Sequence, residues 1–259
     1  QLFREPGRLI CKVFENLNFN KMKKYHYLLI IGAIIAVACS CFNFETIKPS
    51  GKYLKQDRSI GQFNSVSVSS GFELILTQSP STKLTIETYE NIHKVIVTEI
   101  VDGTLKIHPK DNIMITGRAD VKIYLSCNDL KSISSSGGGR VNVENGWKGD
   151  DLKIRTSGGG RIYGTVALNT LEMEMSGGSE SRLSGTVEKI TVSSSGGSSH
   201  EHFGLIAQEC TAQMSGGASA EFNVVKKLSV TASGGTRVRY KGNPVVNKSV
   251  SGGSSVSAE

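Results

Sequence analysis

The sequence EMSGGSE, residues 174–180, returns with small changes along the second half of the chain. Close copies are RTSGGGR (155–161), SSSGGSS (193–199), QMSGGAS (213–219) and TASGGTR (231–237). The first glycines of the doublets are spaced 18 to 21 residues apart, at Gly137, Gly158, Gly177, Gly196, Gly216, Gly234 and Gly252. Self-similarity at a period near twenty is typical of a solenoid, in which each repeat forms one turn.

The residues around each doublet alternate between apolar and polar, as in strands that bury one face. Three positions before the corner serine, the apolar residues are Ile133, Ile154, Met173, Val192, Ala212 and Val230. Five positions before it they are Leu152, Leu171, Ile190, Cys210, Leu228 and Val246. Four residues past the first glycine, a second strand is indicated by Val141, Ile162, Ala220, Val238 and Val256. These columns are predicted to face inward.

Each repeat is therefore predicted to run as strand, SGG corner, strand and return turn. Counterpart strands of successive repeats would pair in parallel, about 4.8 Å apart. The fold class that follows is all-β, a single-stranded parallel β-helix, and the usual handedness of parallel crossovers favours a right-handed one. A corner needs a residue with positive φ, which glycine adopts at no steric cost. A phosphate-binding loop is excluded because a strand follows the glycines and no GK[ST] motif occurs.

The net charge of +7 does not indicate a nucleic-acid partner once its distribution is considered. Residues 1–38 hold six basic and two acidic residues, which leaves 30 − 6 = 24 positive and 23 − 2 = 21 negative charges for the remainder. A remainder of +3 lacks the concentrated basic patch of a nucleic-acid-binding domain.

The sequence MKKYHYLLIIGAIIAVACSC (22–41) has the basic start and short apolar run of a secretory signal. The apolar run from Tyr27 to Ala38 is too short to span a membrane as a helix. Small residues just before Cys39 resemble the lipobox of bacterial lipoproteins, whose cysteine is lipidated after cleavage. The family prefers leucine where this chain has Ala36, and Cys41 is a rival acceptor. Ser40 after the cysteine favours the outer membrane, on its surface or facing the periplasm.

The predicted organisation is an upstream or mis-started segment (1–21), a lipoprotein signal peptide (22–38), a tether (39–55) and a β-helix domain (56–259) with SGG repeats from about 130 to 259. Two cysteines remain in the folded part, Cys127 and Cys210. A disulfide is conceivable in an oxidising compartment. Both cysteines occupy apolar columns, so two buried free thiols are the favoured prediction.

The N-terminal half reads FNSVSVSSGFELILTQ, then LTIETYENI, then DGTLKIHPK, then VKIYLS and LKSISSSGGG at the entry to the repeats. This order over residues 60–258 resembles the putative auto-transporter adhesin head GIN domain family. The resemblance implies a right-handed β-helix and a role in adhesion. Lipid at Cys39 would then supply the membrane anchor.

Few residues suggest chemistry, and no cofactor motif is found. Glu172 and Glu174 share a strand face, but neighbouring repeats offer basic and hydroxyl residues there, which indicates ion pairing. Asp150 and Asp151 are expected in a turn. Trp147 is predicted to cover the core, with sugar stacking as the alternative.

His200 and His202 share one side of a strand, as a metal pair would require. Equivalent positions of neighbouring repeats supply no further ligand, and an extra residue in this repeat would place both histidines at the surface. No metal site is therefore predicted.

Three functions follow from these observations. The favoured hypothesis is a non-catalytic envelope lipoprotein, anchored in the membrane by its lipid, that binds glycan or host or matrix protein. A polysaccharide-active enzyme is the second, since β-helices can present paired carboxylates on adjacent rungs. Self-association into a homo-oligomer is the third, because end strands of a solenoid expose unpaired edges. Lys248 interrupts an apolar column in the last repeat and suggests a terminal cap.

Overall fold

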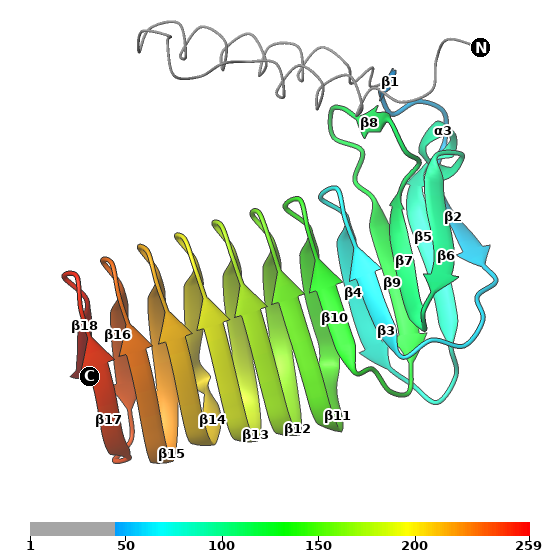
Figure 1. Cartoon of the computed structure of the whole chain (residues 1–259). Helices are drawn as coiled ribbons and strands as arrows, with labels where there is room; N and C mark the ends of the chain where they lie inside the picture. The colour runs from blue at the N-terminus through cyan, green and yellow to red at the C-terminus, as the bar shows by residue number, and fades with distance from the viewer. Residues whose placement is uncertain (1–44) are drawn as a thin grey trace, which may run out of the picture. The chain divides into compact units, whose positions relative to one another are not determined.

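We describe residues 45–259 in a computed structural model of the chain (Figure 1). The predictions for residues 1–44, among them the signal peptide at 22–38 and the lipidation of Cys39, lie outside the described residues. The chain divides into residues 1–45 and residues 46–259, and the second unit contains the whole hydrophobic core. No helix among the described residues is long and apolar enough to cross a membrane.

Strands make up most of the described residues, and the one helix there, α3 (Glu90–His93), is a single turn. The N-terminal strands are β1 (Glu45–Ile47), β2 (Tyr53–Arg58), β3 (Ser65–Val68), β4 (Glu73–Gln78), β5 (Lys83–Tyr89), β6 (Ile96–Val101), β7 (Thr104–Pro109), β8 (Ile113–Ile115) and β9 (Lys122–Cys127). The strands of the glycine-doublet region are β10 (Ser132–Ser135), β11 (Arg140–Thr156), β12 (Arg161–Met175), β13 (Glu180–Ser194), β14 (Ser199–Met214), β15 (Ser219–Ala232), β16 (Arg237–Lys241), β17 (Val245–Val250) and β18 (Ser255–Ala258).

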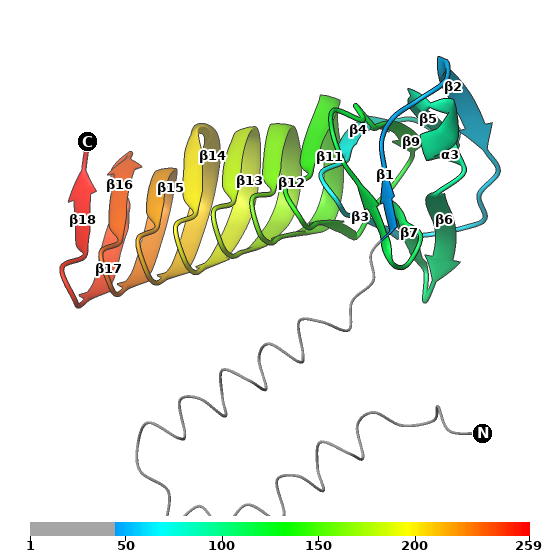
Figure 2. The same ribbon diagram turned by 90° about the horizontal axis from the view of Figure 1, so that it is seen from above.

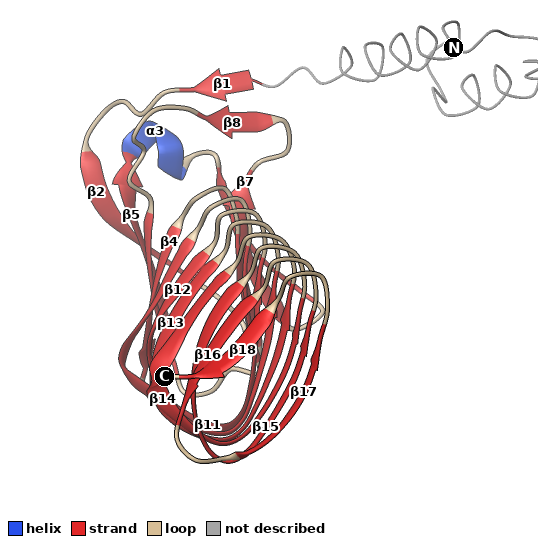
Figure 3. Ribbon diagram, turned by 90° about the vertical axis from the view of Figure 1, so that its left-hand side faces the viewer, coloured by secondary structure: helices blue, strands red, loops and turns tan. Residues whose placement is uncertain are grey.

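The repeat strands pair in parallel, each with its counterpart one turn along the chain. Strand β11 pairs with β12, β12 with β13, β13 with β14 and β14 with β15. The register places Met173 between Ile154 and Val192, so the predicted column is a real stack. Figure 1 shows the strands side by side, and Figure 3 shows the successive turns superposed along the axis. The predicted parallel β-solenoid is confirmed.

The parallel ladder extends further toward the N-terminus than the glycine doublets do. Strand β10 pairs in parallel with β3, and β3 pairs in parallel with β7. This register adds Val66 and Leu105 to the column that contains Ile133. All three side chains are at most 1% exposed, so one apolar column runs from the N-terminal half into the repeats.

The first strands depart from the prediction that residues 56–259 form a β-helix throughout. Strand β6 pairs antiparallel with β7, and β5 pairs antiparallel with both β2 and β9. Asp102 and Gly103 have φ of +49° and +72°, the backbone geometry of a tight two-residue hairpin turn between β6 and β7. Figure 2 shows these strands and α3 gathered at one end of the solenoid.

Each repeat was predicted to contain two strands and a return turn, and the structure corrects this. The strands β11 to β15 are long and continue from one corner to the next. Each runs for 14 to 17 residues and bends within the strand. Gly185 lies at such a bend with φ of +107°, and a Cβ there would overlap the carbonyl oxygen of Val166. The expected turn at Asp150 and Asp151 is consequently part of β11, and Trp147 lies in the same strand.

The last rung ends the apolar column. Lys248 in β17 is in register with Val230, as the sequence indicated. Its Nζ donates a hydrogen bond to the carbonyl oxygen of Val256 at 3.2 Å. Most side chains of β17 are exposed, and Val245 is 70% exposed. Where the other repeats have an apolar side chain in this column, Lys248 thus makes a hydrogen bond, and the apolar column ends there.

The corner glycines stack directly on one another. All seven have positive φ, between +62° and +85°. A Cβ on Gly177 would lie 2.6 Å from the carbonyl oxygen of Gly158, closer than real Cβ atoms approach. By contrast, a Cβ on Gly197 would meet nothing within 4 Å. The first glycine of a doublet is therefore required by both backbone conformation and space, whereas the second at this rung is not.

We predict that Gly177→Ala destabilises the protein and that Gly197→Ala, a matched control, does not. Left-handed backbone costs alanine about 1–2 kcal/mol, and the contact with the Gly158 carbonyl adds to it. The denaturation midpoint in urea should fall clearly for the first variant only. Equal midpoints for the two variants would contradict the assignment of Gly177 to a crowded corner.

Candidate functional site

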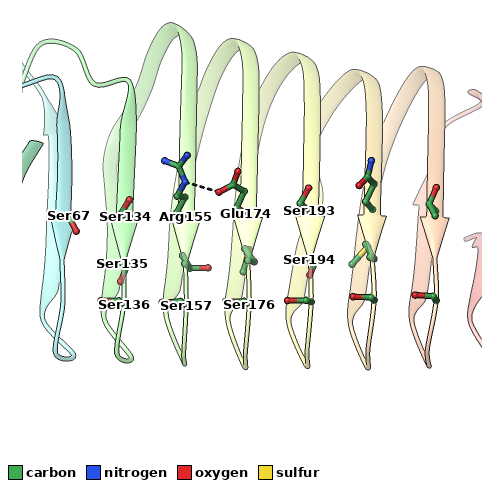
Figure 4. A pocket seen from close by; sticks show the side chains of 18 residues that line it. Ser67, Ser134, Ser135, Ser136, Arg155, Ser157, Glu174, Ser176, Ser193 and Ser194 are labelled. Atoms are coloured by element: carbon green, nitrogen blue, oxygen red, sulfur yellow. Dashed lines mark hydrogen bonds and ion pairs between the residues drawn. The ribbon is translucent and has the colours of Figure 1, made fainter. Parts of the chain in front are cut away.

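A hollow on the described surface forms a trough that runs across successive rungs beside the corners (Figure 4). It has a volume of about 740 Å³, and eleven of its lining residues are serines. We call it the serine trough. The lining residues come from β3, β10 to β15 and the corners that follow them. Its length therefore results directly from the stacking of the repeats.

Two rows of side chains line the serine trough. One row is the outward column two positions before the corner serine, where Ser134, Arg155 and Glu174 are in consecutive register. The other row consists of the corner serines, Ser136, Ser157, Ser176, Ser195, Ser215 and Ser233. Because the repeats stack in register, each row presents one side chain per rung at the spacing of the strands.

Hydroxyl groups of the trough are available to a ligand. The hydroxyls of Ser157 and Ser176 make no hydrogen bond to another described residue. Beneath them, the hydroxyls of Ser135 and Thr156 are buried and have no partner among the described residues. Since buried polar groups are normally satisfied, these two hydroxyls mark a place where a further polar contact is missing.

The two charged side chains that line the trough, Arg155 and Glu174, are paired with each other, and Lys153 and Glu172 next to them extend the network. Lys153 Nζ lies 2.6 Å from a carboxylate oxygen of Glu174 and 2.7 Å from one of Glu172. Arg155 Nε donates to Glu174 at 2.7 Å. These hydrogen bonds, from Lys153 first and then Arg155, lower the pKa of Glu174. The predicted ion pairing is confirmed, and Glu174 is held in the ionised state, unsuited to donate a proton.

Asp150 and Trp147 have structural contacts. Asp150 accepts a hydrogen bond from the Asn169 side chain at 2.7 Å. Trp147 is 1% exposed and belongs to the core, next to Val166 in the parallel register. The prediction that Trp147 covers the core is confirmed, and its alternative as a sugar-stacking surface is wrong.

The two histidines lie in the core, not at the surface. His200 and His202 are 0% and 1% exposed. This rung has one residue more than the preceding one, and the structure accommodates it between Glu201 and Leu205, where the register shifts. Because the shift comes after His200, that residue keeps its inward position. His200 is in register with Ser181 and Ala220, and His202 with Phe222. The expected move of both histidines to the surface is therefore wrong.

Serine hydroxyls are the partners of the buried histidines. The Ser181 hydroxyl lies 3.1 Å from His200 Nδ1 and 2.9 Å from His202 Nε2. His200 Nε2 lies 3.0 Å from the Ser194 hydroxyl, while His202 Nδ1 has no partner. Burial lowers the pKa of His200 to about 4 and that of His202 well below its usual value. Both imidazoles are neutral, and no group of three metal-ligating residues exists among the described residues.

Cys127 and Cys210 are free and buried, as predicted. Burial raises the pKa of each thiol to about 12. Neither thiol is ionised at neutral pH, and neither has the reactivity of a catalytic cysteine.

Sequence reasoning missed Tyr163 and Phe203, two half-buried aromatic residues on the outward face after the corner. Arg182 lies on the strand between them, and these three residues line a second hollow together with Glu201. The only available signal was an aromatic residue at an outward position of a strand. Without the register, nothing in the sequence indicated that Tyr163 and Phe203 face the same hollow.

We predict that the buried histidines make the protein less stable at acidic pH. The unfolded chain takes up protons below about pH 6.5, whereas folded His200 does so only near pH 4, so stability is lost as the pH falls between these values. For His200 alone the loss amounts to about 3 kcal/mol at full effect. His202 adds to it in the same direction.

The test is urea unfolding at pH 7.5 and pH 4.5 with the double variant His200→Ala and His202→Phe. This variant copies Ala220 and Phe222, the residues in register on the next rung. Its midpoint should change less with pH than that of the parent protein, because all other titrating groups are shared. Equal pH dependence in the two proteins would show that the histidines do not titrate on unfolding.

Comparison with solved structures supports the fold. A putative adhesin from Bacteroides fragilis NCTC 9343 is 26% identical, with a TM-score of 0.75 over 82% of this chain and 98% of that one. A putative lipid binding protein from Parabacteroides distasonis ATCC 8503 is 20% identical, with a TM-score of 0.69 over 83% of this chain and 100% of that one. A putative adhesin from Parabacteroides merdae ATCC 43184 is 21% identical, with a TM-score of 0.63 over 83% and 99%.

No curated protein matches the chain. Residues 62–244 match the family described as putative auto-transporter adhesin, head GIN domain. The match contains all but one of the corner glycines, and it includes most of the N-terminal strands as well. The chain therefore belongs to the putative auto-transporter adhesin, head GIN domain family.

Proposed function

We propose that this protein is a non-catalytic, adhesin-like protein of the cell envelope whose serine trough binds an extended glycan. The observation that carries the proposal is the trough itself, an open hollow in which hydroxyl-bearing side chains recur once per rung. A polysaccharide is also a periodic chain of hydroxyl groups, so many weak hydrogen bonds can add along the solenoid axis. Family membership supports an adhesin-like role.

The size and charge of the serine trough favour this ligand. Its volume of about 740 Å³ is within the range of ligand-binding hollows. The basic side chains Lys153 and Arg155 are paired with Glu172 and Glu174. An uncharged polymer can therefore lie along the trough without disrupting these ion pairs.

The arrangement of carboxylates argues against a glycosidase. Such an enzyme needs an acid that keeps its proton near neutral pH, which requires a raised pKa. In the serine trough, Glu174 has a lowered pKa and is hydrogen-bonded to two cations. A trough that holds its acid ionised suits binding better than proton transfer.

The test is an array of glycans and matrix proteins probed with the purified protein and with two Ser→Phe variants. Ser193→Phe places a bulky ring in the middle of the trough, next to Glu174 and the Gln213 position. Ser257→Phe is the matched control, because it lies on the exposed face of β18, away from the trough. We expect glycan binding that falls at least about tenfold for Ser193→Phe, some 1.4 kcal/mol, and is unchanged for Ser257→Phe.

Three outcomes would contradict this proposal. Binding to matrix proteins and to no glycan would show that the ligand is a protein and not a polysaccharide. Glycan binding that is unaffected by Ser193→Phe would place the site elsewhere. No binding on the array, together with concentration-dependent oligomers in sedimentation, would favour the self-association hypothesis.

We further propose that the protein is exported and anchored at the outer membrane by a lipid on Cys39. The signal-like sequence before Cys39 supports this proposal, and residues 1–44 lie outside the described part of the chain. An adhesin-like protein must remain attached to the cell in order to hold a ligand at its surface. A lipid anchor would meet that need.

Metabolic labelling with palmitate tests the anchor. We expect the parent protein and a Cys41→Ser variant to be labelled, and a Cys39→Ser variant to remain unlabelled and precursor-sized. Labelling that persists in Cys39→Ser and disappears in Cys41→Ser would assign the lipid to the neighbouring cysteine. A parent protein that takes up no palmitate would contradict the lipoprotein proposal, and label that persists in both variants would contradict the assignment to Cys39.

A further inference from the structure

A second hollow lies on a different face of the solenoid, on the outer side of β12, β13 and β14 after their corners. It has a volume of about 510 Å³, and its lining includes Tyr163, Arg182, Ser184, Glu201 and Phe203. We call it the aromatic cleft. It shares no lining residue with the serine trough.

Two aromatic rings stand on either side of the aromatic cleft. Tyr163 belongs to β12 and Phe203 to β14, with β13 between them. The rungs are about 4.8 Å apart, so the two rings are separated by roughly twice that distance along the axis. Arg182 of β13 lies over the Tyr163 ring, with its guanidinium carbon 5.9 Å from the ring centre, so Phe203 is the aromatic wall that a ligand can use.

Two cations lie over the Phe203 ring. Lys241 Nζ lies 4.3 Å from the centre of the Phe203 ring, and the Arg239 guanidinium carbon lies 5.7 Å from it. Both residues belong to β16, two rungs beyond β14, and neither lines the aromatic cleft. The cations reach the ring from a strand that lies on the other side of β14 from β12, and Phe203 itself lines the cleft.

The floor of the aromatic cleft is formed by small residues. Gly164 and Gly204 contribute no side chain, and a Cβ on Gly204 would come within 3.2 Å of the Ser184 Cβ. The Ser184 and Thr165 hydroxyls lie 2.8 Å apart and form a hydrogen bond. The glycines thus let adjacent rungs pack closely, and the Ser184 and Thr165 hydroxyls are the polar groups of the floor.

The charged groups at the rim are paired. Arg182 donates to Glu201 from Nη2 at 2.6 Å and from Nε at 2.7 Å, both to the same carboxylate oxygen. Glu221 is paired with Arg239. The other oxygen of Glu201 makes no hydrogen bond to a described residue. The rim therefore offers donor and acceptor atoms without a net charge that would attract an ion.

We propose that the aromatic cleft binds an uncharged pyranose ring, stacked on Phe203 and hydrogen-bonded to Glu201 and Ser184. A pyranose has an apolar C–H face and a rim of hydroxyl groups, which complements an aromatic wall beside paired donors and acceptors. The compensated rim selects against charged sugars and acidic peptides, because binding these would require breaking the Arg182 pair with Glu201. This site does not depend on the serine trough.

Saturation-transfer NMR tests the site with the full protein and a panel of methyl pyranosides of glucose, galactose, mannose and N-acetylglucosamine. Phe203→Leu removes the aromatic wall and keeps an apolar side chain, whereas Phe203→Tyr preserves the ring. For the best ligand we expect Phe203→Leu to raise Kd about tenfold, in line with about 1.4 kcal/mol lost from stacking and apolar contact, and Phe203→Tyr to change it little. Unfolding midpoints would establish that both variants are folded.

The outcomes separate this proposal from the function proposed for the trough. Ser193→Phe, which fills the serine trough, should leave binding of the simple pyranosides unchanged. If no pyranoside binds, or if binding is equal in folded Phe203→Leu and Phe203→Tyr, the aromatic cleft is not a sugar site. If Ser193→Phe abolishes pyranoside binding and Phe203→Leu does not, the sugar lies in the trough and this proposal is wrong.

Discussion

The close backbone stacking at the corners is the constraint on which the rest of the structure depends. At four successive corners the second glycine of the doublet donates a hydrogen bond to the first glycine of the preceding turn, for example at 2.8 Å from Gly178 to Gly158 and 2.9 Å from Gly197 to Gly177. Side chains cannot enter this contact, because a Cβ on Gly177 would meet backbone. Once the corners are held in register, the residues next to a corner stack on their counterparts in the next turn, and differences in length are taken up by shifts within the long strands.

This register has different consequences inside and outside the solenoid. Inside, it aligns apolar columns such as the one through Ile154 and Met173, and their burial supplies the main stabilisation. It also forces polar residues that fall in these columns, His200 and His202, into the core, where Ser181 hydrogen-bonds to both. The cost of burying polar groups is limited because neutral imidazoles and hydroxyls can bond to one another.

Outside, the same register turns single residues into surfaces. One corner serine is an ordinary turn residue, but the stacked serines line a trough of about 740 Å³. One outward aromatic is likewise unremarkable, yet Tyr163 and Phe203 are brought to the two sides of a cleft by the intervening strand. Repetition of the turns therefore builds two distinct surfaces, one lined mainly by hydroxyl groups and one that includes two aromatic rings.

The sequence by itself determined the period, the corner positions and the inward columns, because glycine at positive φ and apolar alternation are local requirements. It also indicated the ion pairs of Glu172 and Glu174, since charges of opposite sign recur one period apart. Only the tertiary structure decided the antiparallel pairing at the N-terminal end and the inward position of His200 and His202. It also decided that Tyr163 and Phe203 line the same hollow. These depend on where an extra residue is accommodated and on which strands become neighbours, and neither is a local property of the chain.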